Sequence, residues 1–333
     1  MSVPVTTIEP RLPLACGALS ERVIEVLQGP AGSSGALGPV PAEPYGRDLQ
    51  LTLYLCYELH YRGFSGVDPD WEWDATLLEL RAQLEHAFLD GVRADVGPIP
   101  PDATVYDEMD SAATEPAHGN GITWYLRDRG SWEQVQEYFV HRSLYHLKEG
   151  DPHAWVIPRL TGQAKASFVA IEFDEYGAGR GQRLHQRLFA DLLAAAGLDP
   201  RYLAYLDAVP AEALAVVNLM SLFGLHRRWR AAAIGHFAAT EITSPPGSAR
   251  VVAALRRLAA PEPCVAFYAE HVEADAVHEQ VVRRDVVADL VDCYPDLERD
   301  VMFGMRAFDA VESRLANLLT TTWSAGQSTL LTL

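Results

Sequence analysis

The sequence predicts an all-α protein built as a helical bundle. Apolar residues recur every three or four positions along most of the 333-residue chain, and few segments show the alternation typical of strands. Ser131 precedes Glu133 and Gln134 at one predicted helix start. Pro210 precedes Glu212 at another, so that an acidic group lies in the first helical turn. These signals together indicate a helical bundle.

The first part of the chain, residues 1–125, is predicted to be an accessory helical region. A short helix over 19–27 is followed by a loop over 29–46, which is crowded with Gly, Pro and Ser. A connector over 97–121, rich in Pro, Gly and Asp, closes the region. Two packed helices lie between loop and connector, marked by apolar residues at helical spacing: Leu51, Leu55, Leu59, Leu77, Leu80, Leu84 and Phe88.

Residues 126–333 are predicted to form the main domain. Gly177, Gly179 and Gly181 each cost a helix about 1 kcal/mol relative to Ala, so the chain is expected to bend or open there. The predicted helices of this domain cover residues 131–148, 160–176, 182–196, 200–207, 210–241, 247–259, 262–292 and 296–323.

The chain is acidic, with 27 basic and 45 acidic side chains and a formal net charge of −18. This charge repels phosphate backbones and anionic membrane surfaces, so we expect no nucleic-acid or membrane partner. Residues 1–13 lack the pattern of a signal peptide, and no apolar run approaches the roughly 18 residues that span a bilayer. The four cysteines contain no C-x-x-C pair. A soluble cytoplasmic protein is expected.

Three potential metal ligands share one face of the helix predicted over 262–292. His271, Asp275 and His278 stand at positions i, i+4 and i+7, which a helix brings to one side. Two imidazoles and a carboxylate therefore converge. A polar helix face turned towards water has the same appearance, so the spacing alone leaves both interpretations open.

Several established site motifs are missing from the sequence. His278 and Glu279 lack the second histidine of H-E-x-x-H, and no phosphate-binding G-x-x-x-x-G-K-[ST] occurs. A ferritin-like iron site needs Glu-x-x-His pairs on helices, whereas the spacing from Glu115 to His118 contains Pro116. No G-x-S-x-G sequence is present. These absences disfavour hydrolytic zinc sites, nucleotide sites, ferritin-like sites and serine hydrolases.

Two further carboxylates stand in apolar surroundings, Glu175 in SFVAIEFDEYG and Glu241 near the end of RAAAIGHFAATEITS. A carboxylate inside a bundle must be paired with a cation, hydrogen-bonded or coordinated to metal. For each residue taken alone, an arginine or a helix cap is as good a partner as a metal.

Taken together, these residues resemble the haem-oxygenase-like di-iron oxidases and oxygenases over about residues 130–325. The final H-x3-D-x2-H helix of that family matches His271, Asp275 and His278 without a gap. Glu175, His185 and Glu241 have the order and spacing of the other core ligands. Glu149 corresponds to an extra carboxylate of the amine- and guanidine-oxygenating branch, to which the chain is most similar.

The resemblance implies two iron ions held by seven ligands. Four carboxylates would balance two divalent cations, and an oxygen-rich set with histidines suits iron or manganese. One ion is expected at Glu149, His185 and His278, and the other at Glu241, His271 and Asp275. Glu175 is expected to bridge the two, with Glu149 and Glu175 acting in catalysis as metal ligands.

By the same resemblance, the protein is expected to be an N-oxygenase of natural-product biosynthesis. It would use O2 and an external reductant to oxidise a small amine, such as a lysine- or arginine-like side chain or an amino-heterocycle, to a hydroxylamine or nitro product. Such a substrate needs a basic anchor if it carries a carboxylate. The candidates, which are also candidates for surface or structural ion pairs, are Arg159, Arg227, Arg228 and Arg230.

The sequence is also compatible with two other functions. A related di-iron oxidase would cleave or desaturate C–C or C–H bonds of a fatty acid or amino acid. A helical protein that binds metal or haem without turnover is the alternative of another class. A homodimer formed through the aromatic-rich segments at 57–64 and 71–73 is also expected.

Overall fold

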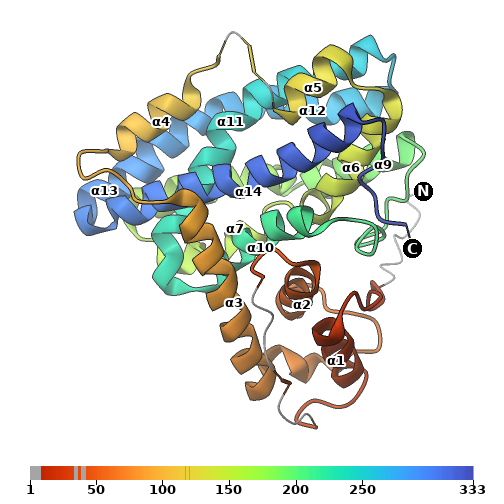
Figure 1. Ribbon diagram of the computed structural model, residues 1–333. Helices are drawn as coiled ribbons and strands as arrows, with labels where there is room; N and C mark the ends of the chain where they lie inside the picture. Colours follow the sequence, from red (N-terminus) through yellow and green to blue (C-terminus); the bar gives the residue numbers. More distant parts are fainter. Residues whose placement is uncertain (1–8, 34–36, 39–42, 117, 120, 333) are drawn as a thin grey trace.

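The computed structural model describes residues 9–33, 37–38, 43–116, 118–119 and 121–332. All regular secondary structure in these ranges is helical, which confirms the all-α prediction (Figure 1). None of the helices in this part of the chain is long and apolar enough to cross a membrane.

The N-terminal region begins with α1 (Ala18–Leu27), α2 (Arg47–Glu58) and α3 (Ala75–Val96), as predicted. In Figure 1, α1 and α2 lie below the main bundle, and α3 rises towards it. α2 packs against α1, α3 and α10, and α3 packs against α14. The apolar core is continuous from this region into the bundle.

The predicted connector over 97–121 is wrong in its middle, where α4 (Val105–Ala113) forms. Thr104 caps this helix by accepting a hydrogen bond from the backbone N–H of Asp107. Val105 and Met109, one turn apart, bury its apolar side. α4 and the following α5 (Ile122–Arg129) both pack against α11.

The helices of the bundle enclose a long central helix, α11, which packs against both α12 and α14. A Cβ atom on Gly235 would lie 1.9 Å from the carbonyl oxygen of Val301, and one on Gly304 would lie 2.0 Å from that of Ala232. Glycine therefore allows α11 and α14 to approach closely. The helices are α6 (Trp132–His146), α7 (Asp151–Ala154), α8 (Gly162–Glu175), α9 (His185–Ala195), α10 (Ala211–Leu225), α11 (Arg230–Arg257), α12 (Glu262–Val281), α13 (Ala288–Cys293) and α14 (Glu298–Ser324).

Shorter helical turns join these elements. α12 continues through a π-helical turn, η6 (Val282–Val287), into α13. The predicted helix over 262–292 is therefore continuous. The other turns are 3₁₀ helices: η1 (Pro69–Trp73), η2 (Ile157–Arg159), η3 (Gly177–Gly179), η4 (Gly181–Arg183), η5 (Arg227–Trp229) and η7 (Pro295–Leu297).

Three predicted boundaries are wrong. Residues 200–207 form turns instead of a helix, with Leu203 in the left-handed backbone region at φ 57°. The predicted helix over 210–241 is two helices, because the chain turns at η5. The expected gap after residue 241 is absent, since α11 runs on through Pro245 and Pro246. Packing on both sides of α11 outweighs the loss of two backbone donors.

Candidate metal centre

All seven predicted metal ligands are brought together inside the bundle. Glu149 lies in the turn between α6 and α7, Glu175 on the last turn of α8, and His185 at the start of α9. Glu241 comes from α11. α12 contributes the remaining three from its inner face: His271, Asp275 and His278. All seven side chains are buried.

One group of donor atoms, which we call the Glu149 half, comprises Glu149, His185, His271 and the shared Glu175. One atom from each residue lies within 4.8 Å of the others. His185 Nδ1 is 2.7 Å from Glu175 Oε2, and His271 Nε2 is 3.7 Å from Glu149 Oε1. This half could hold one metal ion.

The second group, the Glu241 half, comprises Glu241, Asp275, His278 and again Glu175. Donor atoms of Glu175, Asp275 and His278 lie within 4.8 Å of one another. His278 Nδ1 is 3.3 Å from Glu241 Oε2 and 3.5 Å from Asp275 Oδ1. Glu175 therefore stands between two groups, each of which has the ligands for an ion.

The expected division of the ligands between two ions is wrong for two histidines. His271 faces Glu149 and His185, while His278 faces Glu241 and Asp275. The two histidines are seven residues apart, about 10 Å along the helix at 1.5 Å per residue, so they reach different groups. The shared position of Glu175 agrees with the expectation.

A glycine allows the two ends of the loop between Glu175 and His185 to approach each other closely. Gly177 has a φ of 69°, and a Cβ atom on it would lie 2.6 Å from the backbone carbon of Arg183. A side chain here would therefore force the loop open. The expected interruption at the glycines is confirmed, and it brings the last residue of α8 close to the first residue of α9.

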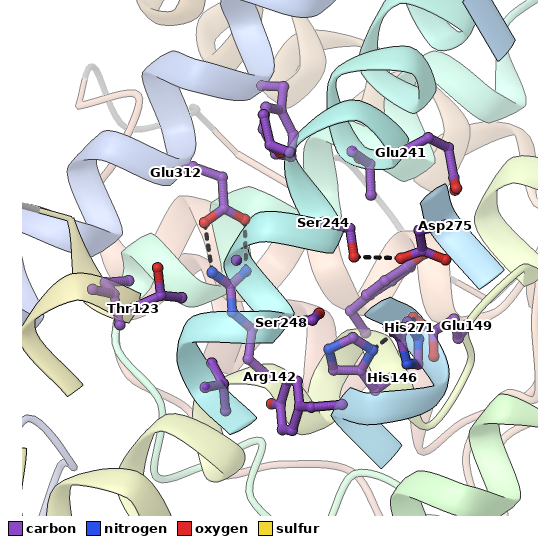
Figure 2. Close-up of a pocket in the computed structure, with 18 of the residues that line it drawn as sticks. Thr123, Arg142, His146, Glu149, Glu241, Ser244, Ser248, His271, Asp275 and Glu312 are labelled. Atoms are coloured by element: carbon purple, nitrogen blue, oxygen red, sulfur yellow. Dashed lines mark hydrogen bonds and ion pairs between the residues drawn. The ribbon is translucent and has the colours of Figure 1, made fainter. Parts of the chain in front are cut away.

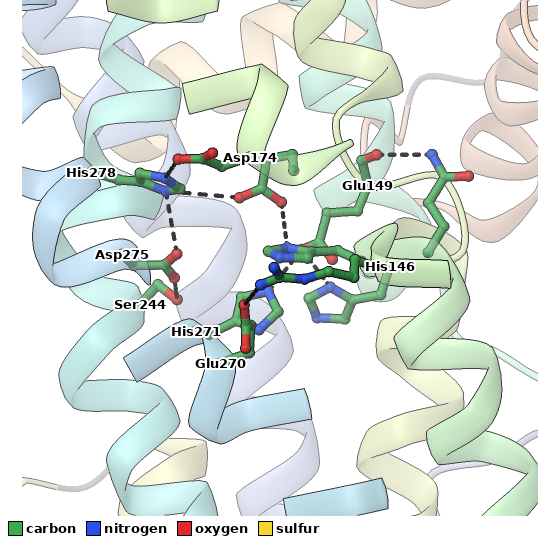
Figure 3. A network of polar contacts seen from close by, with 12 residues as sticks. His146, Glu149, Asp174, Ser244, Glu270, His271, Asp275 and His278 are labelled. Atoms are coloured by element: carbon green, nitrogen blue, oxygen red, sulfur yellow. Dashed lines mark hydrogen bonds and ion pairs between the residues drawn. The ribbon is translucent and has the colours of Figure 1, made fainter. Parts of the chain in front are cut away.

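Hydrogen bonds orient the two α12 histidines. His271 Nδ1–H donates to the carbonyl oxygen of Phe267 at 2.7 Å, which leaves Nε2 facing the Glu149 half. His278 Nε2–H donates to Asp174 Oδ2 at 3.2 Å, which leaves Nδ1 facing the Glu241 half (Figure 3). Metal-binding histidines are commonly held in this way, through the nitrogen that does not bind the ion.

His146 belongs to this site and was missed in the sequence. Its Nδ1 lies 2.7 Å from Glu149 Oε1, and its ring packs against Phe267 and His271. The spacing His-x-x-Glu at the end of α6 was the available signal, because residues three apart meet on a helical turn. Asp174 was also missed, since its position beside Glu175 gives no indication of its contact with α12.

The donor set fits iron. Buried polar atoms nearly always have hydrogen-bond partners, yet several atoms here have none among the residues that the structure describes, because the short contacts among them are not aligned as hydrogen bonds. Carboxylate oxygens and imidazole nitrogens without thiolates suit iron or manganese better than zinc. The unpartnered atoms are Glu149 Oε2, Glu241 Oε2, His185 Nδ1, His271 Nε2 and His278 Nδ1.

The electrostatics of the cluster favour cations. Burial would lower the pKa of His271, but Glu149, with Asp275 and Glu175, raises it to about 10. Burial would also lower the pKa of His278, but Asp275, Glu241 and Glu175 together raise it to about 11. Burial and the charge of Asp275 raise the pKa of Glu241 to about 8. The cluster therefore retains protons until another cation replaces them.

A pocket of about 390 Å³ opens beside the cluster between α5, α6, α11, α12 and α14. Glu149, His271 and Asp275 lie on one side of it, and the Arg142–Glu312 ion pair lies on the other (Figure 2). Arg142 holds both carboxylate oxygens of Glu312, at 2.6 and 2.7 Å. Asp309 lies in the wall of the same pocket. Its burial, together with repulsion from Glu108 and Glu312, raises its pKa to about 6.

The four arginines predicted to anchor a substrate lie away from this pocket. Arg159 donates to the carbonyl oxygens of Gly224 and Leu225 and so caps the end of α10. Arg227 and Arg230 line a separate pocket with Arg159, and Arg228 stacks on Trp229. Their role as anchors stays a prediction that this arrangement does not support.

The comparison with protein families agrees with this geometry. The family of iron-containing redox enzymes matches residues 136–313, more than half of the chain. The chain belongs to this family. The resemblance to haem-oxygenase-like iron enzymes is thereby confirmed, and the chain is assigned to the oxidoreductases. No curated protein matches the sequence significantly. In this iron-containing redox enzyme, the matched region contains all seven candidate ligands and His146.

Proposed function

We propose that this iron-containing redox enzyme is a non-haem di-iron N-oxygenase. It would use O2 and an external reductant to oxidise a small amino-acid-derived amine to a hydroxylamine or nitro product. The observation that carries the proposal is the pair of buried ligand groups that share Glu175, next to a pocket of about 390 Å³. One ion at each group, with O2, would supply the oxidation of the substrate.

The pocket supports a small substrate with a polar end. Near the cluster its walls are aromatic, with Tyr145, Phe237 and Phe267. These rings exclude water from the reacting nitrogen. At the opposite side, Asp309 has no hydrogen-bonding partner among the described residues, whereas Glu312 is neutralised by Arg142. The excess negative charge there favours a second, cationic group on the substrate.

The extra carboxylate supports oxidation at nitrogen. Glu149 lies within the ligand group, and His146 holds it at 2.7 Å. By resemblance, this carboxylate distinguishes the amine-oxygenating branch from the branches that cleave C–C or C–H bonds. In the proposed reaction, the carboxylates and histidines of the chain hold the ions, and the pocket orients the amine beside them.

The test is anaerobic loading with Fe(II), counting of iron per chain, and mixing with 18O2 and candidate amines. Lysine, arginine and an aminoimidazole represent the substrate class, and a medium-chain fatty acid represents the alternative. The proposal predicts two irons and 18O bound to nitrogen in the product. Oxidation of the fatty acid alone, or oxidation of an amine by a Glu149→Ala variant with two irons at the wild-type rate, would overturn it.

A further inference from the structure

A buried ion pair joins the N-terminal region to the segment that carries Glu149. Lys148, the residue before Glu149, donates to Glu58 Oε2 at 3.0 Å. Its side chain is 1% exposed and that of Glu58 is 0% exposed. The ammonium group also lies over the rings of Tyr54 and Tyr61, at 4.6 and 4.2 Å from their centres. A buried charge is tolerated only with such partners, so Lys148 is fixed to α2 and the turn after it.

A second contact ties the turn that carries Glu149 to the start of α9. Arg62 Nη2 donates to the carbonyl oxygen of Leu147 at 3.0 Å and to Gln186 Oε1 at 2.8 Å. Gln186 Nε2 in turn donates to the backbone carbonyl oxygen of Glu149 at 2.9 Å. Arg62 therefore bridges the turn that carries Glu149, at Leu147, and the residue next to His185.

The Glu241 half has no equivalent support. Its ligands come from α8, α11 and α12. Within the described chain, no hydrogen bond or ion pair joins residues 9–96 to any of these three helices. Among the described residues, the hydrogen bonds and ion pairs of residues 9–96 therefore reach the segments next to Glu149 and His185 but not the three helices of the Glu241 half.

We propose that Glu58 and Arg62 are positioning residues that set the metal affinity of the Glu149 half, through Lys148 and Gln186. The inference rests on the metal-binding role proposed above and adds a function for the N-terminal region. Positioning by hydrogen bonds matters most where ligands come from turns, because such segments have no helix to hold them in place.

The test measures each half by itself. The variant His278→Ala leaves the Glu149 half as the remaining complete group, and His185→Ala leaves the Glu241 half. Arg62→Met is placed on each background, because Arg62 is partly exposed and its loss should leave the fold intact. Fe(II) affinity is measured anaerobically by chelator competition, with thermal unfolding of each metal-free variant as the check on folding.

The expected result is a loss of about 10- to 100-fold in iron affinity on the His278→Ala background, the range for removal of groups that orient ligands. On the His185→Ala background the change should be less than about twofold. The double variant Glu58→Gln/Lys148→Met removes the buried charges together and keeps an acceptor for Tyr202, and it should give the same selective loss.

A matched control is Asp95→Asn/Arg314→Met. This ion pair also joins the N-terminal region to the bundle, at 2.6 Å, but touches no ligand-bearing segment. Its removal should leave both affinities unchanged. Equal losses on the two backgrounds, or no loss on either, would overturn the inference. A wild-type chain that binds no iron would instead overturn the proposed function itself.

Discussion

The two halves of the candidate metal centre are built from different kinds of structure. The Glu241 half takes its ligands from positions within or at the end of three packed helices. The Glu149 half takes Glu149 from a turn and His185 from the first residue of α9, after a loop closed by Gly177. Ligands on helices are held by the packing of the core, whereas ligands on turns need supports of their own. We therefore expect the Glu241 half to bind iron more tightly.

The largest effect is expected at the residue that the halves share. Glu175→Ala should reduce iron from two per chain to less than one and abolish oxygenation, with a loss of more than about 100-fold, since removing an orienting group alone costs 10- to 100-fold. The measurements are iron content and product formation. Glu172→Gln is the matched control, because Glu172 is buried one turn earlier on α8 and lies outside both groups. If both variants lost iron equally, the sharing of Glu175 would be wrong.

Single histidine variants should separate the halves. His185→Ala and His278→Ala are each expected to retain about one iron per chain, because each removes a nitrogen donor from one group. The retained ion should be bound more tightly in His185→Ala, which keeps the helical half intact. Anaerobic titration with Fe(II) measures both values. Tighter retention in His278→Ala would reverse the expected order of the halves.

A smaller and selective effect is expected from the partner of His278. Asp174→Ala removes the acceptor that orients this ring, and its side chain is 56% exposed, so folding should be unaffected. Iron affinity of the Glu241 half should fall about 10- to 100-fold, with the Glu149 half unchanged. A uniform loss in both halves would mean that Asp174 stabilises the fold instead of orienting the ligand.

The last effect is on the stability of the metal-free fold rather than on iron binding, and it depends on pH. The pKa values of His271, His278 and Glu241 are raised to about 10, 11 and 8 in the metal-free fold, above their unfolded values. The folded chain then binds more protons than the unfolded chain, so its stability falls as pH rises, by up to about 1.4 kcal/mol per pH unit for each group. Thermal unfolding between pH 7 and pH 10 measures this.

Bound iron replaces those protons, so the iron-loaded chain should lose less stability over the same pH range. His153 behaves in the opposite way, because burial lowers its pKa to about 4. The stability that its neutral form contributes is lost below about pH 6.5 whether or not iron is present, and it provides an internal reference at acid pH. If the metal-free and iron-loaded chains lost the same stability between pH 7 and pH 10, the link between the cluster and its protons would be contradicted.

The sequence predicted which residues form the candidate metal centre but not which of them belong to each half. The helical repeat identified His271, Asp275 and His278, because it fixes which side chains share a face of α12. The apolar surroundings of Glu175 and Glu241 indicated two more, and only the resemblance to the family indicated Glu149 and His185. The division between halves depends on where α9 and α11 cross α12, and no local pattern determines those crossings. His146, Asp174 and the Lys148–Glu58 pair escaped notice for the same reason, apart from the spacing of His146 to Glu149.

The most direct test of the centre is anomalous X-ray scattering at the iron edge from crystals loaded with Fe(II) under anaerobic conditions. We predict two iron peaks in each chain, one bound by Glu149, His185 and His271 and the other by Glu241, Asp275 and His278, with Glu175 in contact with both. A single peak, or one ion bound by both His271 and His278, would contradict the two-half centre.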